Sequence, residues 1–121
     1  MTVKNTLIGG MTDLIVLHFL EQKDCYVYEI SKAVTDLSEG LLTISQTTIY
    51  TATYKLEKEN MITEYSVTVG RKRQRIYYKI EPAGREYLAE LRKFYHMTFS
   101  GMENILNNRI GDITEDETND E

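Results

Sequence analysis

Hydroxyl-bearing side chains at helical spacing are the residues of this sequence whose types and positions most clearly suggest a binding role. A helix is predicted over Gln46–Asn60, and Ser45 can cap it because its hydroxyl can accept a bond from a free N–H of the first turn. Apolar residues at steps of three and four predict its buried stripe, namely Ile49, Ala52 and Leu56. The opposite face carries Thr and Tyr, which can donate to phosphates and touch thymine methyl groups, where an ordinary solvent face carries Glu and Lys. This outward set is Thr47, Thr48, Tyr50, Thr51, Tyr54 and Lys55.

A basic hairpin is predicted directly after this helix. Residues 62–69 and 74–80 are rich in Ile, Val, Tyr and Thr and predict two strands, joined by a turn over Gly70–Arg73. In the second strand Ile76, Tyr78 and Ile80 should face the core, and the residues between them should line the outer face. Four cations, Arg71, Lys72, Arg73 and Arg75, sit at or beside the turn. They suit a narrow, electronegative DNA minor groove, although a plain solvated turn is the alternative.

The distribution of charge supports this interpretation better than the total does. The chain has 121 residues and a formal net charge of −5, which is unusual for a DNA-binding protein. Residues 61–80, however, carry five basic side chains and one acidic one, whereas residues 111–121 carry six acidic side chains and no basic one. The acidic end therefore masks a basic hairpin, and the local charge is the relevant footprint.

The preceding elements must hold the helix and the hairpin in place. Residues 5–22 predict a first helix that is apolar on most sides, and residues 25–35 predict a second, with Asp24 as its cap. Residues 41–44 predict a short strand against the hairpin. The resulting fold class is α+β, mostly helical, a winged helix-turn-helix whose third helix enters the major groove and whose hairpin is the wing.

The last predicted helix, from Pro82 to about Arg109, is too long for a body of this size to cover alone. Its apolar residues repeat at alternating steps of three and four, which is typical of a seam for a partner helix. We therefore predict a homodimer built by the first and last helices, and a long core helix of a monomer is the alternative. The predicted interface residues are Leu7, Met11, Leu14, Leu88, Leu91, Tyr95, Met102 and Ile105. The domains are then 1–80 for DNA binding, 81–110 for dimerisation and 111–121 for a disordered acidic tail.

Five short segments follow one another along the chain, namely Tyr28-Glu29-Ile30, Ser45 with Thr48-Ile49-Tyr50, Lys55-Leu56-Glu57, 75–80 and Ala83-Gly84-Arg85-Glu86. In their order and spacing they resemble the PadR family of bacterial transcriptional regulators. The similarity covers about residues 5–108, with departures at Tyr26, Val27, Thr51, Thr53 and Glu81. It implies a repressor, a phosphate contact by Tyr50, and a response to aromatic small molecules, for which Tyr95, Met97, Phe99 and Met102 could line a space. Plain interface packing is the alternative for those four residues.

Enzymatic chemistry finds little support in the sequence. There is no nucleophile elbow, phosphate loop or zinc-ligand spacing, so we predict no catalytic residue, no metal and no cofactor. Cys25 is predicted to be a structural thiol, and His18 a histidine of the core or of an interface. Neither a membrane span nor a signal peptide is recognisable, which favours the cytoplasm. The leading function is sequence-specific binding of double-stranded DNA, and the alternative is a winged-helix module that binds proteins instead.

Overall fold

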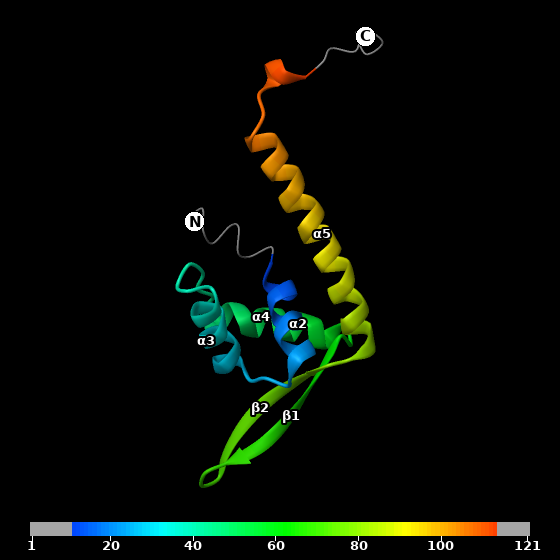
Figure 1. Ribbon diagram of the computed structural model, residues 1–121. Coiled ribbons are helices and arrows are strands. Elements are labelled where there is room, and N and C mark those ends of the chain that lie inside the picture. Colours follow the sequence, from blue (N-terminus) through cyan, green and yellow to red (C-terminus); the bar gives the residue numbers. More distant parts are fainter. Residues whose placement is uncertain (1–10, 114–121) are drawn as a thin grey trace.

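The computed structural model describes residues 11–113, and in this range the chain folds as the predicted winged helix-turn-helix (Figure 1). Leu7 and the rest of the predicted first helix before Met11 lie outside the described residues, as does most of the predicted tail. Among residues 11–113, none of the helices has both the length and the apolar character needed to cross a membrane. The elements are α2 (Thr12–Gln22), α3 (Val27–Leu37), α4 (Gln46–Lys58), β1 (Ile62–Val69), β2 (Arg73–Ile80), α5 (Pro82–Leu106) and the short 3₁₀ helix η1 (Ile110–Asp112).

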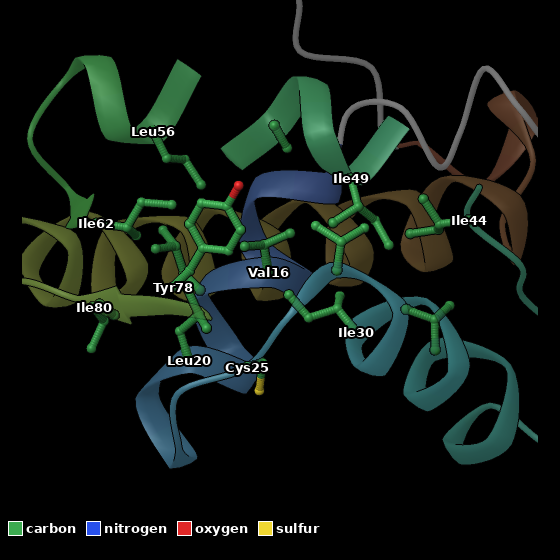
Figure 2. Packing of buried hydrophobic residues seen from close by; sticks show 14 of the residues in the cluster. Val16, Leu20, Cys25, Ile30, Ile44, Ile49, Leu56, Ile62, Tyr78 and Ile80 are labelled. Carbon is green, nitrogen blue, oxygen red and sulfur yellow. The ribbon is translucent and has the colours of Figure 1, made fainter. Parts of the chain in front are cut away.

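The core lies where α2, α3 and α4 meet the base of the hairpin and the start of α5 (Figure 2). Val16 and Leu17 of α2 and Ile49 and Leu56 of α4 are fully buried. Burial of such side chains is the main favourable term in folding, about 1.5–3 kcal/mol each. The predicted stripe of α4 is therefore confirmed, and the helix has one fixed face toward the body and one toward solvent. Other members of the core are Leu20, Ile30, Val34, Ile44, Ala52, Ile62, Tyr78, Ile80 and Leu88.

The hairpin is an antiparallel pair whose register runs from Ile62 opposite Ile80 to Val69 opposite Arg73. Tyr78 and Ile80 are buried and Ile76 packs against the core, which confirms the predicted inward set. The prediction of a short strand over residues 41–44 is wrong. The backbone of this segment forms hydrogen bonds with side chains and does not pair with the hairpin. Ser38 Oγ accepts from the backbone N–H of Leu42 at 2.9 Å, and the hydroxyl of Ser31 donates to the carbonyl of Ile44 at 2.9 Å.

The third strand-like contact of the wing comes instead from the segment between α2 and α3. Cys25 pairs with Tyr78 in an isolated antiparallel bridge, with backbone N···O distances of 2.8 and 3.3 Å. The predicted capping of the next helix by Asp24 is also wrong. α3 begins at Val27 after Tyr26, with no side-chain cap, and Asp24 accepts a hydrogen bond from the Tyr65 hydroxyl instead.

The long helix α5 joins the base of the wing and then leaves the body, on the side away from the hairpin tip (Figure 1). The backbone N–H of Glu81 donates to the carbonyl of Met61 at 2.9 Å, and Gly84 is buried against the same carbonyl. Arg92 donates to both Glu21 and His18 Nδ1 at 2.9 Å, which ties α5 to α2. His18 is exposed in the single chain, so it is not a core residue, and its predicted alternative place in an interface stays a prediction.

Candidate nucleic-acid interface

The N-terminus of α4 is fixed by a side-chain cap. The hydroxyl of Ser45 accepts from the backbone N–H of Thr48 at 3.1 Å, as predicted, and also bonds the Thr48 hydroxyl at 2.9 Å. An Ala in place of such a cap costs about 1 kcal/mol. The cap holds the first turn of α4 rigid, and residues of this turn are the ones that reach base edges in helix-turn-helix proteins.

The outer face of α4 is exposed and nearly free of charge. All six residues of the predicted outward set are exposed. The Nζ of Lys55 lies 2.5 Å from the carboxylate of Asp13 on α2, so the charge of Lys55 is already paired within the chain. That hydrogen bond raises the pKa of Lys55. Lys55 therefore helps to fix α2 on α4, and its predicted role as a DNA contact receives no support from this geometry.

Thr53, which departs from the family pattern, is accommodated inside the molecule. Its side chain is 1% exposed, and its hydroxyl donates to the carbonyl of Tyr50 at 3.0 Å. The Tyr78 hydroxyl points toward α4 in Figure 2. Burial raises the pKa of Tyr78, and a hydrogen bond with the Thr53 side chain acts in the opposite direction. The polar threonine thus costs α4 little, because its hydroxyl is satisfied.

The tip of the wing presents three exposed cations, Arg71, Lys72 and Arg73. Gly70 and Lys72 have positive φ angles of 59° and 57°, which close the three-residue turn between paired Val69 and Arg73. None of the three cations forms an ion pair with any of residues 11–113. Within this described part of the chain, no carboxylate neutralises their charge.

Aromatic side chains brace the wing against the segment that precedes α3. The Tyr65 hydroxyl donates to the Asp24 carboxylate at 2.6 Å, and this bond raises the pKa of Tyr65 to about 12. Tyr65 stacks on Tyr77 with ring centroids 5.8 Å apart, and Tyr77 meets the edge of Tyr26 at 5.4 Å. The Arg75 guanidinium lies 4.2 Å from the centre of the Tyr26 ring. Such contacts fix a cation in place, so Arg75 is oriented before any ligand arrives.

A groove of about 530 Å³ separates the N-terminal end of α4 from the wing. It brings together Tyr50, Arg73 and Arg75 of the predicted DNA-binding set. Thr48, Thr51 and Lys55 line a smaller hollow toward α2, and Thr47, Thr51 and Tyr54 line one toward β1. Sequence reasoning missed four polar or aromatic residues of the groove. The available signals were the two tyrosines on either side of Val27, at the start of α3, and the glutamine after the cap of α4. The missed residues are Tyr26, Tyr28, Gln46 and Gln74.

A second surface is the apolar face of α5 beyond the body. Phe94, Phe99, Met102 and Ile105 are exposed, as are Met97 and Leu106. A hollow of about 310 Å³ at the junction with α2 is lined by three of the four predicted ligand residues, and Met97 does not line it. Leu88 is fully buried in its own chain, so it is a core residue and not an interface residue. The hollow is lined by Met11, Leu14, Leu91, Phe94, Tyr95, Thr98, Phe99 and Met102.

The fold and this surface define the class of winged helix-turn-helix regulators, and comparison with known proteins gives the family. Residues 16–90 match the model of the transcriptional regulator PadR-like family, so the chain belongs to that family of transcriptional regulators and is not an enzyme. A protein of Lysinibacillus sphaericus, called uncharacterized protein X, is 35% identical over 91 residues, which are 75% of this chain and 84% of that protein.

Solved structures agree with the family. A transcriptional regulator from Clostridium thermocellum is 32% identical with a TM-score of 0.76, covering 85% of this chain and 97% of that one. A PadR family regulator from Clostridium difficile is 28% identical with a TM-score of 0.68, covering 79% and 98%. Bacillus subtilis PadR in complex with operator DNA shares the fold at 20% identity and a TM-score of 0.60, covering 64% and 44%. Together these findings support a DNA-binding regulator.

Proposed function

We propose that this protein is a homodimeric repressor that binds an inverted repeat in double-stranded DNA and is released by a small aromatic ligand. The observation that carries the proposal is the placement of an exposed, capped α4 beside a wing whose three tip cations form no ion pair with residues 11–113. α4 is narrow enough to enter a major groove, and the wing then lies over the adjacent backbone or minor groove. A DNA partner implies a cytoplasmic location.

The groove between α4 and the wing supports a division of roles. Tyr50, Arg73 and Arg75 line it, and phenol hydroxyls and guanidinium groups are common donors to phosphate oxygens. We assign these residues to the DNA backbone and Arg71 and Lys72 to the flanking minor groove. Thr47, Thr48, Thr51 and Tyr54 on the exposed face of α4 are assigned to base edges. The fold relative from Bacillus subtilis was solved with operator DNA, which supports the same use of this fold.

The homodimer is supported by the apolar face of α5. Phe99 is 54% exposed and Met102 is 49% exposed in the single chain, on a helix that projects from the body. An apolar surface of this kind is more stable when a second copy covers it. Light scattering at micromolar concentration should give the mass of two chains, and Phe99→Glu should give the mass of one. A monomer mass for the unmodified protein would contradict the proposal.

The ligand is supported by the hollow between α2 and α5. Its lining is almost entirely apolar and includes Tyr95 and Phe99, whose rings stack with centroids 6.0 Å apart. A flat aromatic molecule could insert there and shift α5 relative to the body. A ligand changes DNA affinity only if it prefers one spacing of the two α4 helices over another.

The experiment that tests the proposed function is a selection of bound duplexes from a random-sequence library. The expected result is an enriched inverted repeat with half-site centres about 34 Å apart, one turn of DNA. The Arg71→Ala/Arg73→Ala variant is the matched control and should lose the enrichment. A folded dimer that enriches no duplex, with and without aromatic compounds, would favour a winged-helix module that binds proteins.

A further inference from the structure

The line of α4 that projects farthest from the body contains no cation in its first two turns. Thr47, Thr51 and Tyr54 are exposed at steps of four and three, opposite the buried stripe. The first basic residue of the helix is Lys55, whose Nζ is 2.5 Å from Asp13. Lys58 follows in the last turn, with its Nζ 5.6 Å from the centre of the Tyr54 ring. The part of α4 that reaches base edges is therefore uncharged.

Two of the threonine hydroxyl groups on the exposed face of α4, those of Thr48 and Thr51, are already engaged within the chain. The Thr51 hydroxyl donates its hydrogen to the carbonyl of Thr47 at 3.1 Å, and the Thr48 hydroxyl is bonded to Ser45 at 2.9 Å. A guanine presents two acceptors, O6 and N7, and is usually read by an Arg or Lys that donates to both. Thr51 cannot serve in this way, because its one hydrogen is used within the helix. What Thr51 retains for a base edge is its methyl group.

We propose that α4 reads a half-site core of A·T base pairs and contacts a thymine C5-methyl group through the methyl group of Thr51. This inference rests on the proposed DNA binding. Gln46 is exposed in the first turn, and its side chain makes no hydrogen bond to residues 11–113. A glutamine amide matches the N6 and N7 edge of adenine. Thr47 adds a second methyl beside Thr51. Arg71, which is assigned to the flanking minor groove, agrees with this choice, because A·T-rich tracts have a narrow minor groove that attracts arginine.

The test uses the duplex enriched from the random library, with deoxyuridine placed at each thymine in turn. Deoxyuridine lacks only the C5-methyl group. The unmodified protein should bind about fourfold more weakly for each contacted methyl that is removed, in at least one position of each half-site. Thr51→Ser keeps the hydroxyl and loses the methyl, so it should bind the thymine and deoxyuridine duplexes equally at that position. Thr51→Val keeps the methyl and should retain the discrimination.

The outcomes separate this inference from the function on which it rests. If no duplex is enriched, the proposed DNA binding itself fails. If a duplex is enriched but its half-site core consists of G·C pairs, or deoxyuridine has no effect at any thymine, DNA binding stands and the A·T reading is overturned. A deoxyuridine effect that persists unchanged in Thr51→Ser would overturn the assignment of the methyl contact to Thr51.

Discussion

Replacing Gly84 with alanine should destabilise the protein, although alanine is the better helix former. Gly84 is the third residue of α5 and is buried against the base of the wing. A Cβ atom built on it would overlap the carbonyl oxygen of Met61 and lie 2.9 Å from Ile80 Cγ1. The first neighbour is backbone, which cannot rotate away, so α5 itself must move.

The size of the effect follows from two opposing terms. Overpacking at a filled site costs about 1–3 kcal/mol. The gain in helix propensity is at most about 1 kcal/mol and smaller in the first turn. We expect a net loss of about 1–2 kcal/mol in the free energy of unfolding, or roughly 3–8 °C in Tm. Movement of α5 also strains the bond from Glu81 N–H to Met61, so DNA affinity should fall as well.

Gly101→Ala is the matched control in the same helix. A Cβ at Gly101 has no neighbour within 4 Å in residues 11–113, so only the propensity term remains. This variant should be more stable than the unmodified protein by up to about 1 kcal/mol. Thermal unfolding of all three proteins at one concentration gives the comparison. A Gly84→Ala protein as stable as the unmodified one would refute the packing argument.

Two further predictions concern groups with shifted pKa values. The bond to Asp24 raises the pKa of Tyr65 to about 12, so its contribution to stability is present below about pH 10 and is lost as the pH approaches 12. In a difference titration of tyrosinate absorbance, the step near pH 12 should be absent in Tyr65→Phe and should shift to lower pH in Asp24→Asn. Identical titration curves for the unmodified protein and the two variants would contradict the hydrogen bond between Tyr65 and Asp24. Burial raises the pKa of Cys25 to about 11, so the folded protein should react with a thiol reagent at pH 8 far more slowly than the unfolded protein does, and equal rates would show an accessible thiolate.

The fold could be predicted from sequence because its signals are local. The cap at Ser45, the spacing of Ile49 and Leu56, and the alternation in β2 each dictate a short element, and the order of the elements dictates the fold. The short strand over 41–44 could not be excluded in this way. Its backbone is satisfied by Ser31 and Ser38, and bonds between side chains and distant backbone leave no periodic pattern.

The candidate site was less predictable, because tertiary contacts redirect its residues. Lys55 has the spacing of an exposed contact, but Asp13 of another helix binds it. Asp24 has the sequence position of a helix cap, but its carboxylate accepts a hydrogen bond from Tyr65 on the wing instead. Leu88 has the spacing of the seam on α5, yet the body covers this first part of the helix. Each of these outcomes depends on a residue distant in sequence, which spacing alone does not identify.

The most direct test of the central claim is the salt dependence of duplex binding. The logarithm of the binding constant should fall steeply with the logarithm of salt concentration, by about 0.9 for each phosphate that the protein neutralises. Arg73→Ala should reduce this slope by about 0.9, because one phosphate is then left to its counterions. Lys93→Ala, which removes an exposed cation from α5, should leave the slope unchanged. A steep slope that depends on Arg73 is the result we predict. A shallow slope, or one that the two variants change equally, would contradict DNA binding through α4 and the wing.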